Sequence, residues 1–257
     1  MEIELDFTKS AQENADEYYK RAKRLALKRH GAERAVKELE ERLEKSRHHV
    51  AEAPRVITIK KREWYEKFHW FFTSEGMLAI GGRDAKQNEL VNSRHFEDAD
   101  LFFHADIFGA DLVVLKDGAK AGKQSRIEAA QFAACHSSAW KQGLRTIDVY
   151  AMRRDQVSKS SAKGSLGTGS FLLSGERKWY RDNVLSLVMY VSGSKLFTVP
   201  ESTFERVSGT LGDASHVRVT QGNFKKSDAA KRIAQRLGYG DIDEIMRQLP
   251  ADGFRMS

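Results

Sequence analysis

An apolar seam near the N-terminus constrains the fold more than any other feature of the sequence. Small and apolar residues recur at alternating intervals of four and three, with Arg29 filling one position, at Ala11, Ala15, Tyr18, Ala22, Leu25, Ala32, Val36, Leu39 and Leu43. Ser10 and Glu13 have capping-box spacing just before it. This heptad pattern, flanked by Lys, Arg and Glu, predicts one long coiled-coil helix that needs a partner. Gly31 permits a helical hairpin instead, but a hairpin would have no reason to keep the register across its turn.

Three prolines mark boundaries along the chain, at Pro54, Pro200 and Pro250. Proline cannot continue a helix or a central strand, and each of these follows a change of pattern. We therefore expect a coiled-coil arm over residues 1–55, a core over residues 56–200, and a C-terminal extension over residues 201–257 whose two short helices pack on that core.

The middle of the chain predicts strands with inserted helices. Residues rich in β-formers and bounded by Gly, Asp, Asn or Ser occupy 67–73, 77–80, 101–104, 112–115, 146–150, 170–173 and 184–191. Glu75 and Gly76 suggest a hairpin turn. A helix is expected from Ser125, with Glu128 completing a capping box, through Trp140, and two more over 227–237 and 241–249. Because regular βαβ alternation is lacking, the fold class is α+β, with a mixed or antiparallel sheet and packed helices.

Composition narrows the classes of protein to consider. A single cysteine, Cys135, excludes an internal disulfide and a zinc site built from several thiolates. No apolar run approaches the ~18 residues that a membrane span needs. We expect a cytoplasmic protein without membrane contact, cofactor or metal site.

The net charge of +7 is concentrated in one part of the chain. Residues 116–181 carry 13 basic and 5 acidic side chains, whereas the other three quarters are nearly balanced or acidic. Such a concentration is typical of a face that binds a polyanion, although it also fits an inert solvated surface. Gly- and Ser-rich loops can bring cations to phosphates, and Trp179 can stack on bases. The cationic candidates are Lys120, Lys123, Arg126, Arg153, Arg154, Lys159 and Lys163.

Two shorter motifs allow both a functional and a structural interpretation. Gly81 and Gly82 precede Arg83 and Asp84, which suggests either a phosphate contact at a helix N-terminus or a plain turn capped by Asp84. His104 and Asp106 would share one face of a continuing strand. That pair suits acid–base work or metal binding, or an ordinary structural hydrogen bond.

Cys135 and His136 could suggest a thiol nucleophile. Adjacent residues on a helix point about 100° apart, so His136 is poorly placed to activate Cys135. A buried cysteine is the favoured interpretation.

Several long motifs in fixed order resemble the NFACT-R domain of the NFACT family, which includes the nuclear export mediator factor. They are residues 68–76 (FHWFFTSEG), 80–89 (IGGRDAKQNE), 100–106 (DLFFHAD), 156–159 (QVSK) and 167–171 (GTGSF). Residues 5–19 resemble the start of the helical arm that precedes this domain. Residues 225–231 and 249–250 resemble the archaeal C-terminal ending.

The resemblance implies an RNA-binding role in ribosome-associated quality control. Members of the family bind the large ribosomal subunit and recruit tRNA, so large-subunit rRNA and tRNA are the implied partners. Positions that match the motifs, and therefore form the implied functional face, are Arg83, Asp84, Gln87, Asn88, His104 and Asp106. The chain has no room for the NFACT-N domain or the first coiled-coil strand, so tailing activity is not expected.

Two other functions compete with RNA binding. A coiled-coil adaptor would recruit a protein partner without contacting RNA. A hydrolase centred on His104 and Asp106 would need a nucleophile or metal shell that residue spacing does not supply. We therefore expect no catalytic residues.

The seam generates the first testable prediction. Through residues 11–53 the arm should form a homodimer or pair with the missing strand, because a lone seam exposes Leu25, Val36 and Leu39 to water. Sedimentation of the chain should show a dimer that Leu39→Asp disrupts. A monomer at high micromolar concentration, with the arm still helical by circular dichroism, would contradict this.

Overall fold

The computed structural model describes residues 4–49, 62–161, 164–212, 214–251 and 253–257. Contacts divide the chain into two compact units, residues 1–61 and residues 62–257, which are described separately. The expected boundary at residue 55 lies outside the described residues. Residues 201–257 belong to the same compact unit as residues 62–200. Among the described helices, none has the length and apolar composition needed to cross a bilayer.

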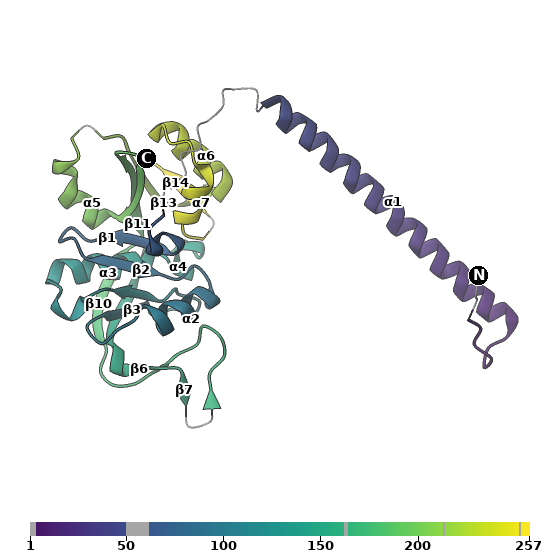
Figure 1. Ribbon diagram of the computed structural model, residues 1–257, viewed down its shortest axis with the longest axis horizontal. Coiled ribbons are helices and arrows are strands. Elements are labelled where there is room, and N and C mark those ends of the chain that lie inside the picture. Colours follow the sequence, from purple (N-terminus) through teal and green to yellow (C-terminus); the bar gives the residue numbers. More distant parts are fainter. Residues whose placement is uncertain (1–3, 50–61, 162–163, 213, 252) are drawn as a thin grey trace. The chain divides into compact units, whose positions relative to one another are not determined.

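The first unit is built on one helix, α1 (Ala11–His49), drawn in purple and blue in Figure 1. It runs without interruption through Gly31, so the single long helix is confirmed and the hairpin is wrong. The capping box is present: Glu13 Oε2 accepts a hydrogen bond from Ser10 N at 2.8 Å, and Ser10 Oγ accepts one from Glu13 N at 3.3 Å. Leu25 and Leu39 of the seam are 54% and 57% exposed. The seam is thus available to a partner helix.

The larger sheet of the second unit is antiparallel and has six strands. Its strands are β1 (His69–Phe72), β2 (Leu78–Gly81), β3 (Leu101–Ala105), β4 (Val113–Leu115), β5 (Thr146–Arg153) and β10 (Lys178–Val184). They lie in the order β1-β2-β4-β3-β5-β10, so β1 and β10 are the edge strands. The hairpin turn at Glu75 and Gly76 is confirmed, with Gly76 at φ +81. Short pairs complete the loop between β5 and β10: β6 (Val157–Ser158) with β9 (Leu172–Leu173), and β7 (Ser160–Ser161) with β8 (Gly164–Ser165).

A second antiparallel sheet contains β11 (Ser186–Ser192), β12 (Lys195–Pro200), β13 (His216–Phe224) and β14 (Phe254–Met256). The strand expected over residues 184–191 is present as β11 but starts two residues later, because Val184 ends β10 and the chain passes from one sheet to the other at Leu185. The helices are α2 (Ala85–Arg94), α3 (Lys123–Cys135), α4 (Ser138–Lys141), α5 (Glu201–Val207), α6 (Lys226–Leu237) and α7 (Ile242–Gln248). The predicted C-terminal helices are therefore confirmed as α6 and α7, and the α+β class is confirmed.

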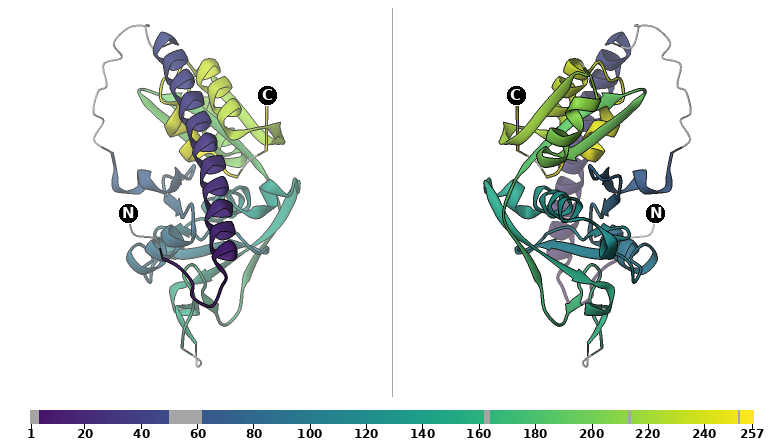
Figure 2. Two further views of the ribbon diagram at one scale, coloured as in Figure 1. Left: turned by 90° about the vertical axis from the view of Figure 1, so that its right-hand side faces the viewer. Right: turned by 90° about the vertical axis from the view of Figure 1, so that its left-hand side faces the viewer.

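Helix α3 lies between the two sheets, where it contacts β3, β5 and β10 of one and β11 and β12 of the other. Figure 2 shows this helix from two sides, with α6 and α7 in yellow green beside the four-stranded sheet. The alanine-rich surface of α3 permits close packing on both sides, where four alanines are fully buried: Ala129, Ala130, Ala133 and Ala134. One hydrophobic core therefore joins both sheets around this helix.

The expected capping box of α3 is wrong. The helix starts at Lys123, and the Ser125 and Glu128 side chains instead reach the β1–β2 hairpin. Buried Glu128 accepts hydrogen bonds from Ser74 N at 2.7 Å and Ser74 Oγ at 2.5 Å. In return, Glu75 accepts from Ser125 N at 3.2 Å and from the Ser125 hydroxyl. The first turn of the helix is thus capped by a residue 50 positions away in sequence.

The expected helix through Trp140 is also interrupted. Helix α3 ends at Cys135, His136 forms its C-cap, and Ser137 caps α4 by accepting from Ala139 N at 3.3 Å. Ser137 is extended, at φ −123 and ψ 167, so it cannot continue the helix. His136 therefore lies at the break between the two helices.

The close approach at Gly82 gives a prediction about stability. A Cβ atom there would lie 2.2 Å from Asn88 Oδ1 and 2.6 Å from Asn88 N, so even alanine does not fit. We expect Gly82→Ala to lower the free energy of unfolding by about 1–3 kcal/mol, as overpacking does, measured by urea denaturation. Gly240→Ala is the matched control, because a Cβ atom at Gly240 would meet nothing within 4 Å. Equal stability of the two variants would contradict the close packing of this turn.

Candidate functional site

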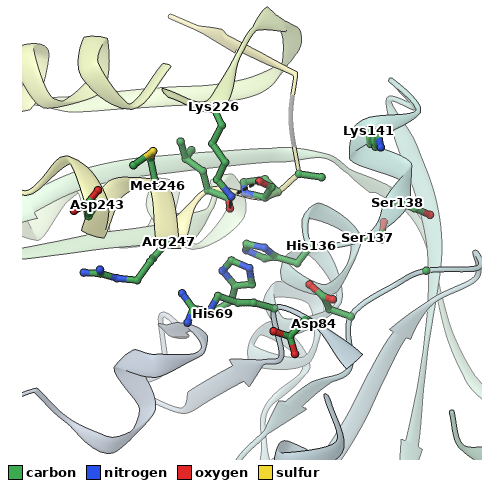
Figure 3. Close-up of a pocket in the computed structure, with 16 residues that line it drawn as sticks. His69, Asp84, His136, Ser137, Ser138, Lys141, Lys226, Asp243, Met246 and Arg247 are labelled. Atoms are coloured by element: carbon green, nitrogen blue, oxygen red, sulfur yellow. Dashed lines mark hydrogen bonds between the residues drawn. The ribbon is translucent and has the colours of Figure 1, made fainter. Parts of the chain in front are cut away.

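A cavity of about 830 Å³ lies in the second unit, and we call it the histidine pocket. Its wall combines residues from six places in the sequence, among them His69, Arg83, Asp84, Asp111, His136 and Arg247. Figure 3 shows His69 and His136 beside each other, with Asp84 below them and Arg247 of α7 approaching from the other side. The pocket therefore depends on β1, the β2–α2 turn, the loop between β3 and β4, the break after α3 and the C-terminal helices.

Three side chains in this pocket have metal-ligand chemistry. One ligand atom from each of His69, Asp111 and His136 lies within 4.8 Å of the other two. The two imidazole rings stack with centroids 4.0 Å apart and an interplanar angle of 28°. Asp111 N donates to the His136 carbonyl oxygen at 3.2 Å, which fixes the loop before β4 against the end of α3.

The histidines are buried without satisfying all their nitrogen atoms. His69 is 5% exposed and His136 is 3% exposed. Within the described part of the chain, His69 Nδ1 and both ring nitrogens of His136 have no hydrogen-bond partner. Buried polar atoms are normally paired, so orphaned nitrogens that face a cavity indicate a site for a ligand.

Burial controls the electrostatics of this group. Burial, reinforced by the charge of Lys226, lowers the pKa of His136 to about 3. Burial, followed by the charges of His136 and Lys226, holds the pKa of His69 well below its usual range. Burial first, then the negative charge of Asp84, raises the pKa of Asp111 to about 8. Both imidazoles are therefore uncharged near neutral pH.

The glycine-containing motif shapes the wall of this pocket. Asp84 caps α2 by accepting from Gln87 N at 2.8 Å, which confirms the capped turn. Gln87 Oε1 in turn accepts from Arg83 N at 3.2 Å and Arg83 Nε at 3.4 Å. Asn88 accepts from Leu112 N at 3.1 Å and hydrogen-bonds the Asp111 side chain. Arg83 and Asp84 thus line the pocket, while Gln87 and Asn88 hold its residues in place.

A second candidate surface follows the edge strand β10, and we define the β10 face as Arg177, Lys178, Trp179 and Arg181. The Arg181 guanidinium lies 4.3 Å from the centre of the Trp179 ring. Trp179 packs edge-on against Tyr150 with centroids 5.3 Å apart, and Arg177 lies 4.6 Å from the Tyr150 ring. Arg177, Lys178 and Arg181 are exposed and Trp179 is half-buried.

Two features extend the β10 face on either side of the strand. A groove of about 480 Å³ is lined by Arg126, Arg153 and Lys178, together with Glu176. Beyond Tyr150 lies His104, whose Nδ1 is 3.3 Å from the Tyr150 hydroxyl. The structure therefore gathers four of the residues selected from sequence, Arg126, Arg153, His104 and Trp179, around one edge of the sheet.

The remaining predicted residues lie elsewhere or serve the fold. Lys120 and Lys123 are exposed near the start of α3, and Asp106 is exposed beyond the end of β3. Arg154 donates to the Val157 carbonyl at 2.8 Å. Lys159 forms an ion pair with Glu89 and donates to the Gly167 carbonyl at 2.8 Å, tying the β6–β9 loop to α2. Lys163 lies outside the described residues.

Sequence reasoning missed the histidine pocket as a group. His69, Asp111 and His136 are separated by 42 and 25 positions, so no spacing pattern connects them. Only one sequence signal pointed to this pocket: two of its residues, His69 and Arg83, lie in consecutive family motifs, at residues 68–76 and 80–89. Tyr150 was also missed, since it occupies an ordinary strand position.

Comparisons with known proteins agree with the motifs. Residues 67–175 match the family model for the NFACT protein RNA binding domain. The chain is 35% identical over 202 residues to the archaeal Rqc2 homolog aRqcH of Methanocaldococcus jannaschii, covering 76% of this chain and 29% of that protein. It is 33% identical over 214 residues to the ribosome quality control complex subunit NEMF homolog of Drosophila melanogaster, covering 80% and 21%.

The human ribosome quality control complex subunit NEMF is 34% identical over 204 residues, covering 76% of this chain and 18% of that protein. The chain thus spans less than a third of the length of each of these relatives. Archaeal and animal proteins align with most of this chain, and the family model covers the region that holds Arg83, Asp84, His104 and His136. The chain therefore belongs to the NFACT family.

Proposed function

We propose that this chain is an RNA-binding module of ribosome-associated quality control, which contacts large-subunit rRNA or tRNA and acts by binding rather than by catalysis. The observation that carries the proposal is the β10 face. Cations on an edge strand alternate there with an aromatic ring that a base can stack on. The named relatives are ribosome quality control factors, which supports the ribosome as the setting.

The chemistry of the β10 face suits a single-stranded or looped RNA. Arg177, Lys178 and Arg181 lie along one edge of the sheet, so they can follow a phosphate backbone there. Arg126 and Arg153 add positive charge in the adjoining groove. Arg181 is also paired with Asp148 at 2.5 Å, which holds its guanidinium over Trp179. An arginine held in this way loses little side-chain freedom when it meets a phosphate or base.

The hydrolase alternative receives little support from the geometry around His104. Its ring contacts the Tyr150 hydroxyl and stacks at 6.0 Å on Phe102, and burial lowers its pKa. Asp106 is exposed past the end of the strand. These contacts make His104 part of the aromatic surface that supports Trp179, and we place its function there.

We further propose that α1 supplies a coiled-coil contact, either to a second copy of this chain or to the missing strand of the arm. Tyr18, Leu25, Val36 and Leu39 all remain exposed on this helix, at the spacing that a partner seam would cover. The arm would then position the RNA-binding unit without itself contacting RNA. We place this RNA-binding role in the cytoplasm, where ribosome-associated quality control acts on stalled ribosomes.

The charge of the β10 face predicts salt-sensitive RNA binding. Arg177→Glu combined with Lys178→Glu should weaken binding to rRNA fragments or tRNA by at least tenfold. Loss of two phosphate contacts should flatten the slope of log affinity against log salt by roughly 1.4 to 1.8 units, at about 0.7 to 0.9 per contact. Filter binding at several salt concentrations measures both quantities.

A matched control makes the same change in charge on α6. Lys231→Glu with Arg236→Glu reverses two exposed cations in the same compact unit, and its affinity and slope should stay near those of the parent chain. If both double variants lose affinity equally, the binding is a net-charge effect and the β10 face is not the site. Unchanged binding by the β10 variant would also overturn the proposal.

A further inference from the structure

The histidine pocket contains a ligand set that the RNA-binding proposal does not use. We propose that His69, Asp111 and His136 form a binding site for one divalent transition-metal ion of the Zn²⁺ type. The inference is independent of RNA binding, because the pocket and the β10 face share no residue. It differs from the sequence-based expectation of no metal site.

The donor set has the composition that such ions prefer. Two imidazoles and one carboxylate are ligands found at zinc sites with an open position, where a fourth place remains for water or an anionic group. Imidazole nitrogen favours Zn²⁺ and its neighbours over Mg²⁺ and Ca²⁺, which take oxygen ligands. Among the residues that the structure describes, both histidines have ring nitrogens without a hydrogen-bond partner, and such a nitrogen is the atom that binds a metal.

The three donor atoms need to move only a short distance toward one another to bind one metal ion. Donor atoms around a tetrahedral zinc ion with bonds of about 2.0 Å lie about 3.3 Å apart, so separations of up to 4.8 Å must shorten by roughly 1.5 Å. Ring rotation at His69 and His136 can supply this, since their unpaired nitrogens make no hydrogen bond that would resist it within the described part of the chain. The Asn88 side chain on Asp111 provides the outer contact that fixes a carboxylate ligand.

Charged side chains of both signs surround the donor cluster. Four cations line the pocket, and Asp84 and Asp243 line it beside Asp111; the cations are Arg83, Lys141, Lys226 and Arg247. Lys226 donates to the carbonyl oxygens of Leu249 at 2.8 Å and Pro250 at 2.9 Å, so part of its charge is compensated there. Asp111 becomes a carboxylate when it binds a metal ion and releases its proton, and this negative charge within the donor cluster then favours a cation over an anion.

The direct test titrates Zn²⁺ into the metal-free full chain, freed of any affinity tag, by isothermal calorimetry. We expect one Zn²⁺ per chain, with Kd raised at least tenfold by Asp111→Asn and by His136→Gln. Asp111→Asn keeps the shape of the side chain but removes the carboxyl group that a metal ion would deprotonate and bind. His95→Gln is the control, because His95 is a histidine of the same unit that stacks on Trp64 away from the cluster, and it should bind as the parent chain does.

A second measurement serves if a buried-histidine variant fails to fold. X-ray absorption of the Zn²⁺-loaded parent chain should count two imidazole ligands and one carboxylate oxygen. The proposal is overturned by the lack of saturable Zn²⁺ binding, by binding that Asp111→Asn leaves unchanged, or by a spectrum without two imidazoles. It is also overturned if inorganic phosphate occupies the pocket and binds more tightly to Asp111→Asn.

Discussion

The second unit depends on the reciprocal hydrogen bonds between the β1–β2 hairpin and the start of α3. Glu128 is fully buried, and an unpaired buried carboxylate would be costly. The backbone and hydroxyl of Ser74 satisfy it, while Glu75 caps the helix through Ser125. These contacts hold α3 in the narrow space between the two sheets, which its alanines allow it to occupy.

Both candidate sites follow from that placement. At the C-terminal end of α3, His136 stacks on His69 from the start of β1. The hydrogen bond from Asp111 N to the His136 carbonyl oxygen places Asp111 beside them. On the same helix Arg126 reaches the groove next to Lys178 of β10. One helix therefore connects a buried polar pocket with the exposed cationic edge of the sheet, and each site uses a different surface of it.

The sequence allowed prediction of features that arise from local pattern, such as the heptad seam of α1 and the hairpin turn before β2. Ser125 and Glu128 show why other features failed: their capping-box spacing is real, yet a loop some 50 positions away competes successfully for both side chains. The residues of the candidate site likewise include some that local sequence pattern predicts and some that only the fold reveals. Concentrated positive charge directed attention to the β10 region, but only strand pairing shows that β10 forms an edge and brings Trp179 onto Tyr150. No spacing reveals that the two histidines of the pocket stack, because they come from separate elements that only the topology brings together.

Ultraviolet crosslinking of the full chain to bound RNA, followed by mass spectrometry of the crosslinked peptides, tests the central claim most directly. The account predicts crosslinks to residues 177–181 and to the peptides that contain Arg126 and Arg153. Crosslinks confined to α1 or α6, with residues 177–181 unmodified, would contradict it.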